Sequence, residues 1–151
     1  MKRLLIVFHS QSGNTERMAQ AVLRGARQIE ETETVLRRAF DASLEDLLGC
    51  HGLLIGTPEN FGYMSGAVKD FFDRTYYPAE GKTIGLPYAI FVSAGNDGTG
   101  AVTQIERIAN GYGWKRVAEP VIARGGLHPD DLARCEELGA TLAAGIAFGV
   151  F

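Results

Sequence analysis

Three hydroxyl side chains are gathered in the segment His9-Ser10-Gln11-Ser12-Gly13-Asn14-Thr15, which follows a short apolar run near the N-terminus. Apolar residues then recur at steps of three and four, so the segment leads into an amphipathic helix. The first N–H groups of a helix lack helical partners, and the helix dipole favours negative charge there. Hydroxyls at Ser10, Ser12 and Thr15 therefore predict a site for a terminal phosphate monoester, held by neutral donors because the segment has no Lys or Arg.

The spacing of this segment disfavours other chemistry. It lacks GxxxxGK[ST], which binds nucleoside triphosphates, and GxGxxG, which presses a bridging pyrophosphate against bare backbone. Ser10 and His9 do not suit a hydrolase, because adjacent residues at a strand end point to opposite faces; a buried His9 with one hydrogen bond is expected instead. The alternative for the hydroxyls is helix capping. One residue would satisfy that alternative, so three hydroxyls beside Gly13 favour the phosphate.

Alternating apolar patterns predict the elements that position this segment. They indicate five strands that alternate with five helices, as in βαβ units with a mostly parallel sheet and helices on both faces. Pro120 makes the pairing of the last strand uncertain. Ser43 to Asp46 has the spacing of a capping box. The strands are expected at residues 3–8, 34–40, 51–56, 87–92 and 114–123, and the helices begin near residues 15, 43, 65, 99 and 129.

Ligands of such sheets bind beyond the carboxyl ends of the strands. The function is therefore expected in the segments after strands one, three and four. The second of these is Gly56-Thr57-Pro58-Glu59-Asn60-Phe61-Gly62-Tyr63-Met64-Ser65-Gly66, and the third is Ser93-Ala94-Gly95-Asn96-Asp97-Gly98-Thr99-Gly100.

These three segments resemble those of a known family. Residues 10–15 resemble the phosphate loop of flavodoxin-like proteins, which bind flavin mononucleotide (FMN). Residues 56–66 are similar to the flavin loop of the WrbA-type NAD(P)H:quinone oxidoreductases, and residues 93–100 resemble the polar loop after strand four in the same families. The resemblance implies one flavodoxin-like domain over residues 1–151. Its fold would be an α/β three-layer sandwich with a five-stranded parallel sheet in the order 2-1-3-4-5.

The resemblance further implies FMN as the cofactor and NAD(P)H as the reductant. The flavin carries the chemistry, so no catalytic side chain and no metal site are expected. Pro58 ends a strand without needing a donor, Gly62 and Gly66 allow backbone to approach a flat ring, and Phe61 or Tyr63 offers an aromatic surface. The expected cofactor-binding residues are Ser10, Gln11, Ser12, Gly13, Asn14, Thr15, Pro58, Glu59, Asn60, Phe61, Gly62, Tyr63, Ser93, Ala94, Gly95, Asn96, Asp97 and Gly98.

Several of these residues also have an ordinary structural explanation. Phe61 and Tyr63 are explained equally well as packing residues under a loop. Residues 96–98 form a common turn sequence, and solvent exposure explains Glu59. Arg124, after the last strand, is a weaker candidate for contact with a nucleotide phosphate.

Two kinds of flavin chemistry compete for this site. In the first, NAD(P)H gives a hydride to the flavin, and a quinone or similar small acceptor then takes two electrons. In the second, the flavin passes single electrons to a redox partner protein, as in flavodoxins. Carrier flavodoxins are usually strongly acidic, which a net charge of -3 supports poorly. An NAD(P)H-dependent oxidoreductase is therefore favoured, with an electron carrier and a non-catalytic flavin sensor as alternatives.

Composition sets the broader limits. The chain has 151 residues, 46% of them hydrophobic, with 15 basic and 18 acidic side chains, which suits one domain and gives no basic footprint for nucleic acid. Cys50 and Cys135 form no CxxC pattern, as expected in a reducing cytosol. The apolar run of residues 4–8 is too short for membrane insertion or a signal peptide. A cytoplasmic protein is expected. Homo-oligomers stay possible, although the chain is shorter than WrbA-type enzymes.

Overall fold

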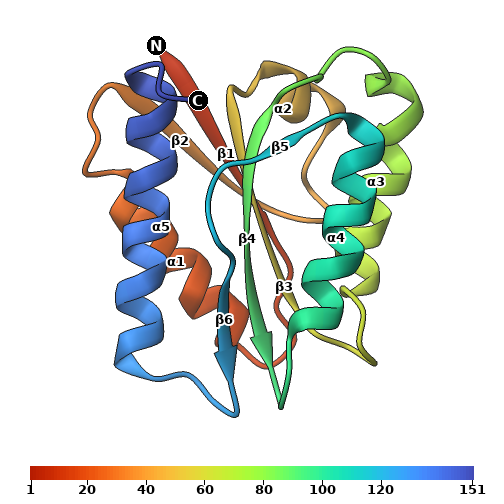
Figure 1. Cartoon of the computed structure of the whole chain (residues 1–151), viewed down its shortest axis with the longest axis vertical. Coiled ribbons are helices and arrows are strands. Elements are labelled where there is room, and N and C mark those ends of the chain that lie inside the picture. The colour runs from red at the N-terminus through yellow and green to blue at the C-terminus, as the bar shows by residue number, and fades with distance from the viewer.

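A parallel β-sheet forms the middle layer of the structure, a computed structural model that describes residues 1–151 (Figure 1). The order of its strands is β2-β1-β3-β4-β5, and β6 also pairs with β4. This order confirms the flavodoxin-like fold. The strands are β1 (Lys2–Phe8), β2 (Thr32–Arg38), β3 (Gly52–Pro58), β4 (Pro87–Ala94), β5 (Lys115–Arg116) and β6 (Val121–Arg124).

Helices cover both faces of the sheet. Helices α1 and α5 lie side by side on one face, and α3 and α4 lie on the other (Figure 1). The expected helix starts are confirmed: Ser43 caps α2 in a capping box with Asp46, Ser65 caps α3, and Pro129 is the first residue of α5. No helix is long and apolar enough to cross a membrane. The helices are α1 (Asn14–Ala26), α2 (Leu44–Gly49), α3 (Gly66–Ala79), α4 (Thr99–Tyr112) and α5 (Pro129–Ala147).

The sheet separates two apolar cores, and β1 contributes to both. Leu5 and Val7 belong to the core under α3 and α4. Leu4, Ile6 and Phe8 belong to the core under α1 and α5. Successive side chains of a strand point to opposite faces, so a strand covered on both sides needs the continuous apolar run seen in this sequence.

The strand expected over residues 114–123 is instead two short strands. β5 pairs with Pro87 and Tyr88, whereas β6 pairs with residues 91–94 farther along β4. Pro120 lies just before β6 and has no N–H to donate to a ladder. The sheet therefore has a sixth strand, and β6 brings its carboxyl end beside that of β4.

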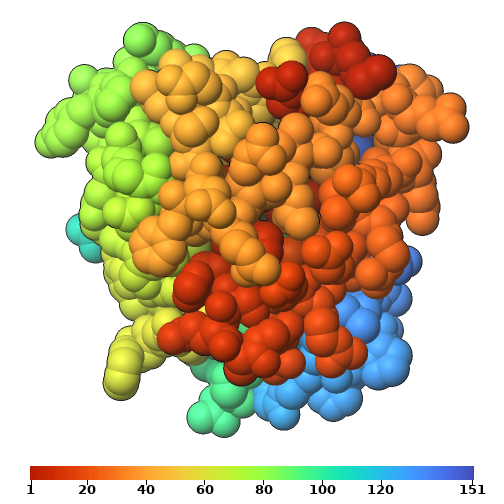
Figure 2. All heavy atoms as spheres, turned by 180° about the vertical axis from the view of Figure 1, so that it is seen from behind, coloured from red at the N-terminus to blue at the C-terminus, as the bar shows by residue number.

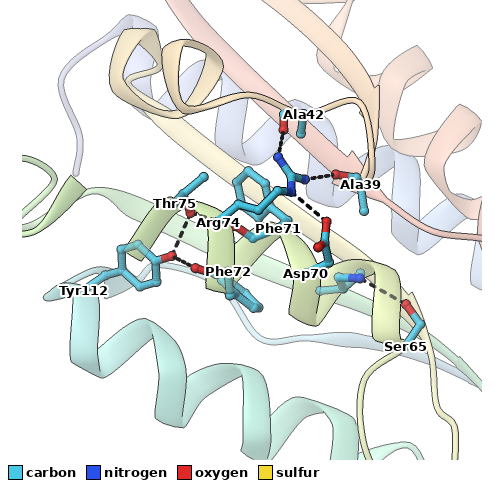
Figure 3. A network of polar contacts seen from close by, with 10 residues as sticks. Ala39, Ala42, Ser65, Asp70, Phe71, Phe72, Arg74, Thr75 and Tyr112 are labelled. Carbon is cyan, nitrogen blue, oxygen red and sulfur yellow. Dashed lines mark hydrogen bonds and ion pairs between the residues drawn. The ribbon is translucent and has the colours of Figure 1, made fainter. Parts of the chain in front are cut away.

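Arg74 anchors α3 to the turn after β2 (Figure 3). Its guanidinium donates to the carbonyl oxygens of Ala42 (2.9 Å) and Ala39 (2.8 Å), and its Nε donates to the carboxylate of Asp70 (2.6 Å). Three hydrogen bonds in fixed directions suit the planar fork of Arg. Since α3 follows directly after residues 56–65, this anchor also fixes the end of that segment.

Tyr112 ties α4 to α3 from the other side (Figure 3). Its hydroxyl donates to the carbonyl oxygen of Phe72 (2.8 Å) and lies 2.8 Å from the hydroxyl of Thr75. Burial raises the pKa of Tyr112 to about 12, so the phenol stays protonated and able to donate. The ring also stacks on Trp114, with 4.3 Å between ring centroids.

Helices α1 and α5 approach so closely that their backbones touch. A Cβ atom added at Gly139 would lie 2.0 Å from the carbonyl oxygen of Val22, and one added at Gly25 would lie 1.8 Å from that of Glu136. Both neighbouring atoms are backbone and cannot rotate away. The two glycines therefore set the spacing of this helix pair.

Substitution Gly139→Ala is expected to lower the free energy of unfolding by about 1–3 kcal/mol, because the helices must separate to admit the methyl group. Gly111→Ala in α4 is the matched control, since its Cβ would meet only the Tyr76 ring at 3.7 Å. That control should be neutral or more stable by about 0.5–1 kcal/mol, because Ala is the better helix former. Urea denaturation followed by circular dichroism measures both. Equal stability of the two variants would contradict the close contact.

Candidate functional site

Four loops meet at the carboxyl edge of the sheet. The first loop (residues 9–13) follows β1, the second loop (59–65) follows β3, the third loop (95–98) follows β4, and the fourth loop (125–128) follows β6. Figure 2 shows the segments coloured red, yellow, teal and blue gathering at the lower end of the molecule. A cavity of about 510 Å³ opens between them. This volume is in the range of small-molecule sites.

Each of the three predicted loops contributes residues to the lining of the cavity, together with the strand or helix end next to it. The predicted residues that line it are Gln11, Ser12, Asn14, Pro58, Glu59, Asn60, Ser93, Ala94 and Gly95. The predicted residues that lie around it without lining it are Ser10, Gly13, Thr15, Phe61, Gly62, Tyr63, Asn96, Asp97 and Gly98. Gly125 and Gly126 of the fourth loop also line the cavity, although neither was predicted to bind the cofactor. The only sign in the sequence that these residues could line a site is that two consecutive glycines follow the last strand.

The N-terminus of α1 has no side-chain cap. Its N-cap residue is Gly13, which has a left-handed backbone with φ of 103°, and the N–H of Gly13 donates to Ser10 Oγ (3.1 Å). Asn14, the first residue of the helix, lines the cavity. Because no protein side chain caps the first turn, its N–H groups are open to an acceptor in the cavity.

The other helices that begin at this edge do have caps. The hydroxyl of Ser65 accepts from Val68 N at the start of α3 (3.4 Å). At the start of α5, His128 and Asp131 form a capping box, in which the carboxylate of Asp131 accepts from His128 N (3.0 Å). Glu59 performs this role for α4. Only α1 therefore presents an uncapped positive end to the cavity.

The sequence suggested that Glu59 is simply exposed to solvent. In the structure, Glu59 instead reaches from the second loop to α4. Its carboxylate accepts from the N–H groups of Gly98 (3.0 Å) and Ala101 (3.1 Å). The N–H of Glu59 itself donates to the carbonyl oxygen of Ser93 (2.8 Å). Nothing local in the sequence signals this role, because the acceptor and the donors are about 40 residues apart.

Thr15 and Ser93 form a hydroxyl pair between α1 and β4. Their oxygens are 2.8 Å apart, and Thr15 is buried while Ser93 lines the cavity. One hydrogen bond uses one of the two hydroxyl protons. The pair therefore keeps a second proton available for an acceptor, and it joins the first loop's helix to the strand before the third loop.

The tip of the second loop is a tight turn that holds Phe61 in solvent. Asn60 and Tyr63 exchange two backbone hydrogen bonds of 2.9 Å each. The residues between them, Phe61 and Gly62, have φ of 53° and 72°, as in a type I′ turn. Phe61 is fully exposed and is the one non-glycine residue with positive φ. The packing explanation therefore holds for Tyr63, which contacts the core, and fails for Phe61.

The third loop is fixed by its own turn and by Arg124. The carboxylate of Asp97 accepts from the hydroxyl of Thr99 (2.6 Å), and its backbone carbonyl accepts from Arg124 Nε (2.7 Å). These contacts support the turn explanation of Asp97. They also direct Arg124 to the third loop, while Asn96 stays exposed.

His9 lies at the end of β1 and outside the cavity lining. It is half-buried, and its ring meets Phe40 edge-on with 6.2 Å between centroids. Burial, and then the positive charge of Arg38, lower the pKa of His9 below 6.5. The lowered pKa disfavours a positive charge on the imidazole at this end of the first loop.

Replacing Arg38 with Gln is expected to raise the pKa of His9, because one of the two causes of its shift is removed. His51 is the internal control, since burial and the charges of Lys2, the N-terminus and Arg3 lower its pKa. An NMR titration of the imidazole protons measures both; a shift of His51 alone would contradict the assignment.

The same shifts predict how stability depends on pH. Both histidines bind protons less readily in the folded protein than in the unfolded chain, where their pKa is about 6.5. The unfolded state therefore binds more protons, and the free energy of unfolding falls as the pH drops below about 6.5.

Comparison with known proteins identifies the family. Residues 2–126 match the family model described as NADPH-dependent FMN reductase. The chain belongs to this family. It is 37% identical over 100 residues to a flavodoxin of Aquifex aeolicus, and the alignment covers 66% of this chain and 54% of that protein. It is 31% identical over 126 residues to an NAD(P)H dehydrogenase (quinone) of Acidithiobacillus ferrooxidans, covering 70% of this chain and 63% of that protein. The chain thus spans less than two thirds of either relative's length.

Solved structures confirm the fold. A flavodoxin from the domain Archaea has a TM-score of 0.83 and 23% sequence identity, covering 95% of this chain and 98% of that one. A WrbA-like flavodoxin from Agrobacterium tumefaciens has a TM-score of 0.80 and 22% identity, covering 97% of this chain and 98% of that one. The family model and the relatives confirm the predicted membership of the flavodoxin-like, FMN-binding families, and these structures confirm the fold.

Proposed function

We propose that the protein binds one FMN in the cavity between the four loops and uses it to oxidise NAD(P)H. The observation that carries this proposal is the uncapped N-terminus of α1, which opens into a cavity shared with the second and third loops. The phosphate would lie at this N-terminus and the ring against the second and third loops.

The donors of the cavity fit a phosphate monoester. No Lys or Arg lines the cavity, so its donors are neutral: the N–H groups of α1, the hydroxyl of Ser12 and the hydroxyl pair of Thr15 and Ser93. Hydrogen bonds to a charged group contribute about 1.5–3 kcal/mol each. Several such bonds at a helix N-terminus suffice to hold a dianion without a cationic side chain.

The second and third loops fit a flat ring. Gly95 has no side chain and no atom near its would-be Cβ, so backbone can face the ring there. The second loop holds Pro58, Glu59 and Asn60 at the cavity wall, and its tip carries the exposed ring of Phe61. Bound FMN supplies hydride and electron transfer, and the residues of this chain position the ring and limit access to it.

A small acceptor such as a quinone fits the second half of the reaction. The family description and the relative named NAD(P)H dehydrogenase (quinone) support this function, as does the weak net charge of -3. The second candidate is electron transfer to a partner protein, which the flavodoxin of Aquifex aeolicus favours. Exposed Phe61 beside the cavity suits contact with either acceptor.

Titration with FMN tests the binding site. Protein at micromolar concentration should quench FMN fluorescence. The substitutions Ser12→Ala and Thr15→Val should each lower the affinity for FMN by about tenfold, which is the effect of losing one hydrogen bond to a charged group. The affinity for riboflavin, which lacks the phosphate, should fall by less than about twofold in the same variants, because no hydrogen bond to a charged group is lost. Thr103→Val, on the exposed face of α4, is the matched control. Equal losses for the two flavins would place the phosphate elsewhere.

Anaerobic mixing with NADH or NADPH tests the reaction. The FMN-loaded protein should lose its visible flavin absorbance in one rapid phase, and a quinone added afterwards should restore the absorbance. If neither nucleotide bleaches the flavin and dithionite reduces it in two separate one-electron steps, the electron-carrier alternative is favoured.

A further inference from the structure

Strand β2 is an open edge of the sheet. The strand order gives it one neighbour, β1, and its seven residues make it longer than β5, with two, or β6, with four. The segment that contains β2, coloured orange in Figure 2, lies on the surface. Its register with β1 is continuous over residues 32–38, and it contains neither a bulge nor a proline. Proteins usually blunt such an edge, because its free backbone groups can pair with another strand.

Alternate residues of β2 turn their backbone groups away from β1. The N–H of Ala39 donates to the last residue of β1 (2.7 Å). Because the bonds of a parallel ladder involve every second residue, the odd-numbered residues of β2 bond to β1 and the even-numbered ones face outward. Thr34 and Leu36 therefore present their N–H and C=O groups at the edge. Of these four groups, only the carbonyl oxygen of Leu36 has a partner, the Nη1 of Arg37 at 3.4 Å.

The charges along this edge are divided between its two ends. Glu30, Glu31 and Glu33 lie at the amino end, and Arg37 and Arg38 lie at the carboxyl end. All five residues are exposed. An antiparallel neighbour with the same sequence would bring each acidic end against a basic end, whereas a parallel neighbour would oppose like charges. The edge is therefore complementary to itself in the antiparallel direction only.

We propose that β2 pairs in the antiparallel direction with β2 of a second copy of this chain, about a two-fold axis at Val35. This register overlaps the whole of both strands. It pairs the outward backbone groups of Thr34 with those of Leu36 in the second copy, and the reverse. Side chains lie closer together in the pairs that do not exchange hydrogen bonds. In this register those pairs are Val35 with Val35, and Glu33 with Arg37 on each side of the axis.

The pairing extends ion pairs that each chain already has. Glu33 bonds to Arg3 (3.2 Å), and Arg37 bonds to Asp46 (3.3 Å). Both side chains are exposed enough to meet a second partner. Contact between Glu33 and Arg37 of the second copy would form a row of four alternating charges. Exposed ion pairs contribute little affinity, so the backbone bonds hold the two copies together and the charges select the direction and the register.

Charge substitutions at the two opposed positions test this pairing. Glu33→Arg places basic side chains opposite each other on both sides of the axis, and Arg37→Glu places acidic ones there. Each variant alone should weaken the dimer by about tenfold or more, because two attractive pairs become repulsive. An equimolar mixture of the two variants should form a mixed dimer, since every opposed pair then has opposite charges. Sedimentation velocity, with one variant fluorescently labelled, measures both effects.

A second pair of variants tests the backbone bonds. Thr34→Pro removes an N–H that faces away from β1, so the bonds between β2 and β1 are kept. Thr34→Ala is its matched control, because it removes the side chain and keeps the N–H. Only Thr34→Pro should dissociate the dimer, and far-ultraviolet circular dichroism checks that each variant is folded.

Glu80→Arg at the end of α3 and Arg107→Glu on α4 are the controls for net charge, because both residues are exposed and lie outside β2. They should leave the dimer unchanged. A monomeric unsubstituted protein at its highest soluble concentration overturns the inference. A dimer that survives both substitutions at Glu33 and Arg37, or a mixture of these variants that stays monomeric, also overturns it. None of these measurements needs a bound flavin, so their outcome is independent of the proposed function.

Discussion

Helix N-termini need acceptors, and a parallel sheet gathers them at one edge. Here four helices follow strands whose carboxyl ends meet, so their unpaired N–H groups face the same region. Ser65, Glu59 and Asp131 satisfy three of these helix ends. The fourth, at α1, has a glycine N-cap and no side-chain cap. Because of this difference, an anion that enters the cavity has one helix N-terminus, that of α1, at which to bind.

The loops around the cavity are held by bonds to one another more than by bonds within each loop. Thr15 joins α1 to Ser93 at the end of β4, Glu59 joins the second loop to α4, and Arg124 joins the end of β6 to the third loop. Each bond connects segments that are distant in the chain. The shape of the site is therefore a property of the whole edge.

Sequence patterns predicted the features that depend on nearby residues. The capping box at Ser43, the cap at Ser65 and Pro129 at the start of α5 are local signals, and the structure has all three. The three cavity loops were also expected, because their place follows from the order of strands. Contacts over long separations were not predictable, including those of Glu59 and the pairing of Thr15 with Ser93 across 78 residues. The division of the last strand near Pro120 was signalled only as uncertainty.

The backbone contact between α1 and α5 links the site to the end of the chain. Gly25 and Gly139 hold the two helices at a spacing that neither can change alone. A ligand at the start of α1 stabilises that helix by mass action, and the close contact extends the gain to α5. Terminal helices open locally more easily than central elements. A ligand bound in the cavity would therefore slow detachment of the last helix and its exposure to proteases, and the supply of that ligand would then affect the lifetime of the polypeptide.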